Sequence, residues 1–222
     1  MNKLALFDCD GTLVDSQANI CAAVEEAFAL HGMAIPERAA IRRIVGLSLV
    51  EAMRGLLPDA GEAQHRAMAE DYKLAFQRMR ATGALADEPL FEDMLPTLDA
   101  LEADGWVLGV ATGKSDRGLA HVLDLHGIRQ RFVTLQTADR HPSKPHPSMI
   151  ELAMAEAGAA PETTVMIGDT SYDMMMGRNA GTRALGVAWG YHPPAELLAS
   201  GAHAVAESVA DLPGLMAPRA TA

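Results

Sequence analysis

The stretch Phe7-Asp8-Cys9-Asp10-Gly11-Thr12-Leu13-Val14-Asp15-Ser16 decides how the rest of the sequence is interpreted. It continues the apolar run 4–7, which predicts a buried strand, and it sets two aspartates one residue apart at the end of that strand. Because alternate side chains of a strand share a face, we expect Asp8 and Asp10 to project together and Cys9 to point into the core. Adjacent carboxylates repel each other unless a cation or a donor neutralises them. The pattern therefore favours a divalent-metal site over an ordinary Asp-Gly turn.

An EF-hand calcium loop also begins with Asp-x-Asp, but this stretch does not fit one. That loop requires Gly at its sixth position and Glu at its twelfth. Here Leu13 and Asn19 stand at those positions. The sequence therefore excludes a calcium loop of this type.

Composition and charge restrict the classes of function. The 222 residues include 49% hydrophobic ones, enough for a substantial core, and no run approaches the roughly 20 apolar residues of a membrane helix. The net charge of -11 disfavours nucleic acid and anionic membranes as partners. Two cysteines give no disulfide framework, and the N-terminal run resembles no signal peptide. We therefore expect a cytoplasmic protein. The sequence does not indicate its oligomeric state.

Short apolar runs alternate with helical stretches along most of the chain. We predict further strands over 107–111, 132–135, 164–167 and 183–188, with helices over 94–103, 119–125 and 148–157 between them. This alternation predicts an α/β fold with a Rossmann-like parallel sheet core and helices on both faces.

The segment 16–86 departs from this alternation because it is helical throughout. Ile20, Val24 and Phe28 recur at helical spacing, Pro36 suits the first turn of a helix over 37–45, and Ser48 with Glu51 has the spacing of a capping box. A long helix follows over 64–80. We expect an inserted α-helical cap domain (residues 16–86) and a core domain (residues 1–15 and 87–222). The hinges would lie at 15–16 and 85–89, and 217–222 would be frayed.

Chemically active side chains follow several of the predicted strands. In open parallel sheets, functional residues gather at the carboxyl ends of the strands. Asp8 and Asp10 follow the first strand, Thr112 and Gly113 the second, and Asp169 and Asp173 the fourth. Lys144 lies in the loop Pro142-Ser143-Lys144-Pro145, whose prolines fix its direction. One edge of the sheet is thus predicted to hold four carboxylates, a hydroxyl and a lysine.

This set suits the binding of magnesium and phosphate. Mg²⁺ prefers oxygen ligands and keeps several waters, so two or three carboxylates and a carbonyl suffice. We assign Asp8, the Asp10 main-chain carbonyl and Asp169 as ligands, with Asp173 either a ligand or the holder of a bound water. Thr112 would donate a hydrogen bond to a phosphate oxygen, and Lys144 would offset the charges of Asp8 and of the phosphate.

The same residues resemble the four motifs of the haloacid dehalogenase (HAD) superfamily of phosphohydrolases. The opening Asp-x-Asp-Gly-Thr, a strand-end Thr, a Lys-Pro in a loop and a Gly-Asp followed by a second Asp occur in that order. A helical insert after the first motif resembles the superfamily's subclass I cap. The resemblance implies that Asp8 is the nucleophile and Asp10 the general acid/base. It also implies that Thr112 and Lys144 orient the phosphoryl group, with Gly11 and Gly113 beside it.

Other classes of protein fit the sequence less well. Leu108 stands where a P-loop needs Gly, and neither cysteine has the Arg of a cysteine phosphatase six residues later. A sugar-phosphate mutase of the β-phosphoglucomutase type remains an alternative, because it shares the nucleophile and the acid/base. Its relatives tend to carry Glu-Asp where this chain has Asp169-Thr170, which favours a phosphatase. A non-catalytic HAD-like binding protein is a further alternative, although such proteins usually lose one of the acids.

The expected partner is a small phosphorylated metabolite. The first motif and the run 45–48 resemble those of phosphoglycolate phosphatases. Arg42 and Arg43 are candidates to meet a substrate carboxylate, although a solvent-exposed helix face is the competing interpretation. The eight histidines show no metal-ligand spacing. We therefore expect an Mg²⁺-dependent phosphatase of a small organic phosphomonoester, resembling phosphoglycolate.

Overall fold

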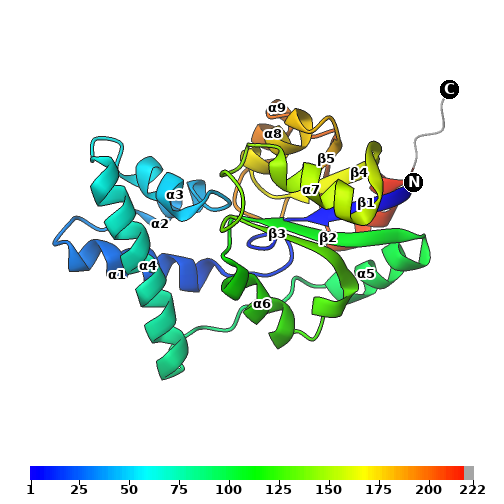
Figure 1. Ribbon diagram of the computed structural model, residues 1–222. Helices are drawn as coiled ribbons and strands as arrows, with labels where there is room; N and C mark the ends of the chain where they lie inside the picture. The colour runs from blue at the N-terminus through cyan, green and yellow to red at the C-terminus, as the bar shows by residue number, and fades with distance from the viewer. Residues whose placement is uncertain (218–222) are drawn as a thin grey trace.

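A computed structural model describes residues 1–217, and its centre is a parallel sheet of six strands. The strand order is β3-β2-β1-β4-β5-β6, with β1 in the interior (Figure 1). The chain therefore has the α/β, Rossmann-like fold that the sequence predicts. The strands are β1 (Asn2–Phe7), β2 (Trp106–Thr112), β3 (Phe132–Thr137), β4 (Ala159–Gly168), β5 (Arg183–Val187) and β6 (Ala204–Ala206).

Helices cover both faces of the sheet. Since side chains alternate along β1, Phe7 packs on one face and Leu6 on the other. The Phe7 face meets α5 (Met94–Ala103), α6 (Asp116–Leu125) and α10 (Leu212–Met216), and the Leu6 face meets α7 (Ser148–Ala157) and α8 (Ser171–Asn179). The other helices beyond β2 are α9 (Pro194–Ala199) and two short 3₁₀ helices, Arg129–Arg131 and Val209–Asp211.

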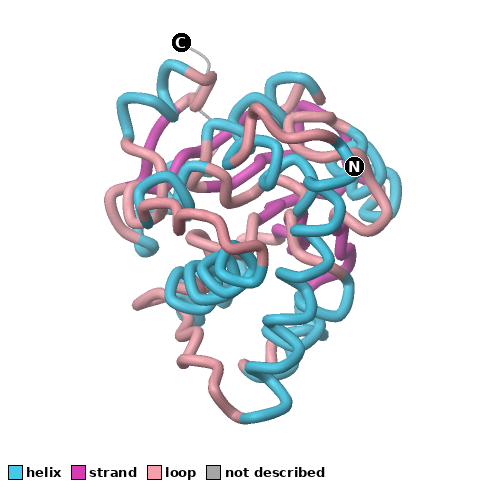
Figure 2. The backbone as a smooth tube through the Cα atoms, turned by 90° about the vertical axis from the view of Figure 1, so that its left-hand side faces the viewer, coloured by secondary structure: helices cyan, strands magenta, loops and turns pink. Residues whose placement is uncertain are grey.

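Four of the five helices between β1 and β2 form a separate unit beside the carboxyl edge of the sheet (Figures 1 and 2). They have a hydrophobic cluster of their own, in which Val24, Phe28, Ile41, Met53 and Met68 are buried together. The strongest contacts inside the unit join the last helix to the first and third. The helices are α1 (Gln17–Leu30), α2 (Arg38–Arg43), α3 (Leu49–Leu56) and α4 (Glu62–Thr82).

The two connections between this helical unit and the sheet run side by side. The amide of Asp15 donates to the carbonyl of Pro89 (3.0 Å), and the amide of Phe91 donates to the carbonyl of Leu13 (3.1 Å). Asn19 exchanges two hydrogen bonds with the main chain of Ala86, at 2.8 and 2.9 Å. The chain leaves the sheet and returns to it at one place. We therefore propose the domain division that the sequence predicts, with a cap of residues 16–86 on a core of residues 1–15 and 87–222.

Some local predictions were wrong. Pro36 precedes α2 instead of occupying its first turn, because Glu37 is the N-cap. Helix α3 begins after Ser48 as predicted, but the Ser48 side chain makes no capping hydrogen bond, and Glu51 pairs with Arg54 instead. Strand β4 already begins at Ala159. The predicted fraying of the terminus falls largely on 218–222, outside the described residues.

Within residues 1–217, no helix combines the length and the apolar character that crossing a bilayer requires.

Candidate active site

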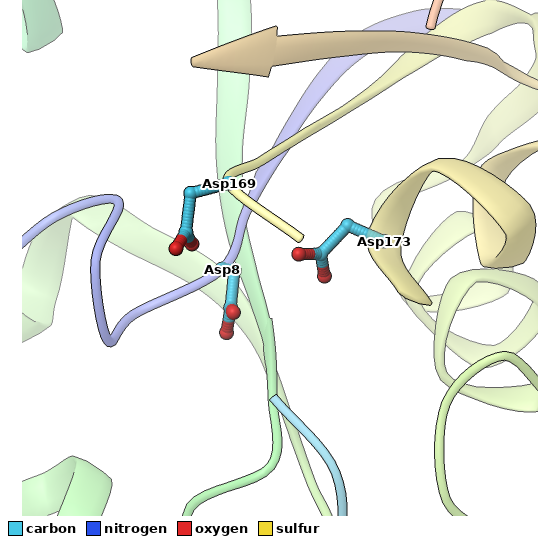
Figure 3. Close-up of side chains that lie close together, drawn as sticks. All are labelled: Asp8, Asp169 and Asp173. Carbon is cyan, nitrogen blue, oxygen red and sulfur yellow. The ribbon is translucent and has the colours of Figure 1, made fainter. Parts of the chain in front are cut away.

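Three buried aspartates meet at the carboxyl edge of the sheet. Asp8 directly follows β1, Asp169 follows β4, and Asp173 lies in the first turn of α8 (Figure 3). Each contributes a carboxylate oxygen to a group whose members all lie within 4.8 Å of one another. Strands β1 and β4 are adjacent and parallel, so their carboxyl ends bring together residues 161 positions apart in sequence. Residues far apart in the sequence thus form one acidic centre.

Asp8 holds an oxygen that has no partner. Its Oδ1 accepts a hydrogen bond from the amide of Cys9 (2.6 Å) and lies 3.0 Å from the ammonium of Lys144. Its Oδ2 is buried and, within residues 1–217, accepts no hydrogen bond. Burial, opposed by Lys144 and reinforced by Asp173 and Asp10, raises the pKa of Asp8 to about 7. A buried carboxylate oxygen left without a donor is costly unless a bound group completes it.

Asp169 is held by contacts from two other loops. The hydroxyl of Thr12 donates to Oδ1 (2.8 Å), and the amide of Tyr191 donates to Oδ2 (2.9 Å). Burial, with the charges of Asp8 and Asp173, raises the pKa of Asp169 well above its ordinary value. When its carboxylates are ionised, the cluster therefore carries more negative charge than the surrounding protein neutralises.

Gly11 allows the first loop to approach Asp169. Its φ is +80°, and a Cβ there would lie 2.3 Å from Oδ2 of Asp169 and 2.5 Å from a ring carbon of Tyr191. A side chain at this position would displace one of these two neighbours.

Lys144 bridges two of the acids. Its Nζ lies 2.6 Å from Oδ1 of Asp173 and 3.0 Å from Asp8, and its side chain is wholly buried. Burial opposes the ammonium charge, but attraction to Asp173 and Asp8 outweighs this effect and raises the pKa of Lys144. The other oxygen of Asp173 accepts from the amide (3.1 Å) and the hydroxyl (2.7 Å) of Thr170, which form a capping box at the start of α8. Asp173 is therefore fixed at both oxygens.

The donor set fits a hard divalent cation. The three carboxylates supply oxygen ligands, and one lysine shared by two acids leaves net negative charge for a cation to neutralise. These are the residues that the sequence assigned to the metal through their side chains. The assignment of the Asp10 main-chain carbonyl stays a prediction.

Asp10 is held by a different lysine. Its Oδ1 lies 2.8 Å from the ammonium of Lys114 and also accepts from the hydroxyl of Ser16. Lys114 is largely shielded from solvent, with a side chain 11% exposed. Burial opposes its charge, but Asp10 raises the pKa of Lys114 overall. The second acid of the opening motif thus lies outside the three-carboxylate group.

The loop after β2 lies beneath the helical unit. Thr112 is buried, and its hydroxyl accepts from the amide of Lys114 (3.2 Å). A Cβ on Gly113 would lie 2.7 Å from the carbonyl oxygens of Gly46 and Leu47, so the helical unit touches the main chain at this point. The amide of Ser48 also donates to the hydroxyl of Ser143 (2.9 Å), next to Lys144. The helical unit is thus closed over the loop after β2 and over the loop that carries Lys144.

The two arginines of α2 lie elsewhere. Arg42 is exposed, and the structure does not bring it together with the other predicted residues. Its role in substrate binding stays a prediction. Arg43 is engaged, since both of its terminal nitrogens donate to Glu196 of α9.

Sequence reasoning missed Lys114 and Tyr191 as parts of this site. Lys114 follows the predicted Thr112-Gly113, and Tyr191 comes shortly after β5. Both lie just beyond the carboxyl end of a strand, so the rule that found Asp169 also pointed to them. Which aspartate Lys114 and Tyr191 each contact depends on tertiary packing.

Known proteins resemble this chain in both sequence and structure. The family model described as haloacid dehalogenase-like hydrolase matches residues 5–187. A protein named "Probable phosphatase IndB" from Dickeya dadantii is 34% identical over 219 residues, which cover 96% of this chain and 93% of the relative. A phosphoglycolate phosphatase from Vibrio vulnificus is 30% identical, covering 95% and 94%. The crystal structure of a haloacid dehalogenase-like protein from Bacteroides fragilis has a TM-score of 0.87 at 26% identity, covering 96% and 100%.

Proposed function

The chain belongs to the haloacid dehalogenase-like hydrolase family and is a phosphoric monoester hydrolase, and we propose that it works through an aspartyl-phosphate on Asp8. The observation that carries the proposal is the unpartnered buried Oδ2 of Asp8 beside two further carboxylates and a buried lysine. A nucleophile needs one oxygen free of hydrogen bonds, and a phosphate dianion needs nearby positive charge.

Mg²⁺ is the proposed cofactor. Asp8, Asp169 and the Asp10 main-chain carbonyl would hold it, and Asp173 would either bind it or hold one of its waters. When bound, the cation neutralises negative charge on the phosphoryl oxygens.

The residues of the chain supply the remaining chemistry. A free oxygen of Asp8 attacks phosphorus in line, and the bond from phosphorus to the leaving oxygen breaks. Asp10 gives a proton to that oxygen and then takes one from the water that attacks the aspartyl-phosphate, so inorganic phosphate and the carboxylate of Asp8 are released. Lys144 offsets the charge that accumulates around Asp8, and Thr112, Gly11 and Gly113 orient the phosphate. Lys114 and Ser16 hold Asp10 in place.

The proposed substrate is a small organic phosphomonoester that resembles phosphoglycolate. The Vibrio relative bears that name, and the same opening motif supports the proposal. A sugar-phosphate mutase would use the same nucleophile and acid/base. It would convert its substrate into an isomer with little free phosphate.

Replacement of the nucleophile tests the proposal. Asp8→Asn is expected to abolish Mg²⁺-dependent release of phosphate from p-nitrophenyl phosphate and from phosphoglycolate. The control is Asp15→Asn, which changes an exposed acid of the same loop and should leave turnover within about twofold of the wild-type value. Full turnover in Asp8→Asn would refute the assignment. Binding of phosphate esters by the wild-type protein without any turnover would instead support the non-catalytic alternative.

A further inference from the structure

A cavity of about 120 Å³ begins at the proposed acid/base and extends beneath the helical unit. Asp10, Gly113 and Lys114 are among the residues that line it. In the proposed function Asp10 protonates the leaving oxygen, so the rest of the leaving group would extend from Asp10 into this cavity. A single buried water needs roughly 15 Å³ on the same measure, so there is room for a group of several non-hydrogen atoms.

Apolar side chains from three helices form most of the wall. Ile20 and Val24 come from α1, Met53 from α3, and Tyr72 and Phe76 from α4. The rings of Tyr72 and Phe76 lie 5.3 Å apart, centroid to centroid. Walls of this kind favour carbon over hydroxyl groups, because a sugar would leave its hydroxyls without hydrogen-bond partners.

Arg80 adds a cation to the same face of α4. Tyr72, Phe76 and Arg80 are spaced four residues apart, so all three side chains lie on one stripe of the helix along the cavity. The Nε of Arg80 is buried and, among residues 1–217, has no hydrogen-bond partner. Its neighbour Arg78 instead bonds to Glu26 on the surface. An unpaired buried donor on a cation is costly and points to an anionic group that binds there.

The acids that line the cavity already have partners. Asp10 pairs with Lys114, and Glu88 accepts a hydrogen bond from the side-chain amide of Asn19 (2.8 Å). Arg117 also lines the cavity. Apart from the neutral side chains of Gln77, Ser115 and His121, the lining groups left to interact with a ligand are therefore apolar or cationic.

We propose that this cavity binds the leaving group of the substrate, and that this group is an apolar chain or ring of several carbon atoms ending in a carboxylate that pairs with Arg80. The inference rests on the proposed phosphatase function and narrows its substrate class. Phosphoglycolate has the carboxylate but a single methylene, so it would leave the apolar walls unfilled.

A series of ω-carboxyalkyl phosphates tests the length of the group. Phosphoglycolate, 4-phosphooxybutanoate and 6-phosphooxyhexanoate differ in their methylenes, and butyl and hexyl phosphate are matched esters without the carboxylate. We expect kcat/KM to rise about fourfold for each methylene that the walls bury. The longest carboxylate should exceed hexyl phosphate by about tenfold, because a charge-assisted hydrogen bond to Arg80 replaces one to water.

Variants on α4 separate the two contributions. Arg80→Gln should remove the preference for the carboxylate and leave hexyl phosphate unchanged, and Arg80→Lys should restore part of the preference. Phe76→Ala should flatten the dependence on chain length in both series. The control is Arg66→Gln on the same helix. The Arg66 side chain is 69% exposed and pairs with Glu62, so this variant should change neither the preference for the carboxylate nor the dependence on chain length.

The outcomes distinguish this inference from the proposed function. If phosphate is released from every ester but kcat/KM does not rise with chain length, the inference is overturned and the proposed phosphatase function still stands. If Arg80→Gln lowers kcat/KM equally for the esters with and without a carboxylate, at an unchanged unfolding temperature, the role of Arg80 is overturned. If phosphate is released neither from these esters nor from p-nitrophenyl phosphate, the proposed function itself is overturned.

Discussion

The ammonium of Lys144 lies 3.0 Å from Oδ1 of Asp8, and both side chains are shielded from solvent. The same ammonium contacts Asp173 at 2.6 Å, so one lysine compensates two buried acids. A buried ion pair adds little net stability over apolar side chains, but removal of one partner leaves an uncompensated charge. Lys144 is therefore expected to matter for folding as well as for chemistry.

Replacement of Lys144 should destabilise the protein strongly. Lys144→Met should lower the free energy of unfolding by about 3–5 kcal/mol, because two carboxylates remain buried without their cation. The surface pair of Lys73 and Glu70, with side chains 41% and 66% exposed, provides the control. Lys73→Met should cost less than about 1 kcal/mol. Urea unfolding of both variants gives the comparison, and equal losses would contradict the expected role of burial.

Magnesium should stabilise the protein more at alkaline than at acidic pH. The pKa of Asp8 rises from 3.8 to about 7 on folding, so its contribution to stability is present below about pH 4 and is lost as the pH rises through 7. A cation that binds the ionised carboxylates opposes this loss. With EDTA the unfolding temperature should fall between pH 5 and pH 8, and with excess Mg²⁺ it should fall less. An Mg²⁺ effect of the same size at both pH values would contradict this coupling.

Gly11 should tolerate no side chain. In Gly11→Ala the new Cβ would meet Oδ2 of Asp169 at 2.3 Å, at a φ of +80°. We expect turnover to fall by more than about a hundredfold, because a displacement of about 1 Å in a catalytic group costs that much. Gly32→Ala shares a positive φ of +61° but has no atom within 4 Å of the new Cβ. It should lose only about 1–2 kcal/mol of stability and keep its activity. Normal turnover in Gly11→Ala would show that Asp169 can shift without consequence.

The sequence predicted the sheet and its acidic edge because both follow from local patterns. Strand β1 is a buried apolar run, and Asp8 and Asp169 directly follow strands that any parallel sheet brings together at their carboxyl ends. Strand β6 was missed because Ala204–Ala206 offers only three small or half-buried residues, and its pairing with β5 alone makes it a strand.

The partners of individual side chains could not be predicted from sequence. Lys114 meets Asp10, and Arg43 meets Glu196, which lies 153 residues away. Ser48 begins α3 as its type suggests, but its amide donates to Ser143 and its hydroxyl makes no cap. Such contacts depend on how the helical unit docks on the sheet, and no local pattern encodes that geometry.

The contact between Arg43 and Glu196 should set how readily the helical unit opens. It joins α2 to α9, and the hydroxyl of Tyr172 reinforces it by donating to the carbonyl of Arg43 (3.0 Å). Because the Arg43 and Glu196 side chains are 51% and 26% exposed, their coupling should be about 0.2–1 kcal/mol. Arg43→Glu should raise KM by about two- to fivefold at low salt with little change in unfolding temperature, since the closed arrangement becomes less populated. The double variant Arg43→Glu/Glu196→Arg should recover much of the loss. Arg38→Glu breaks a pair with Glu25 inside the helical unit and should leave KM unchanged. A double variant no better than Arg43→Glu would mean that the two side chains do not act as a pair.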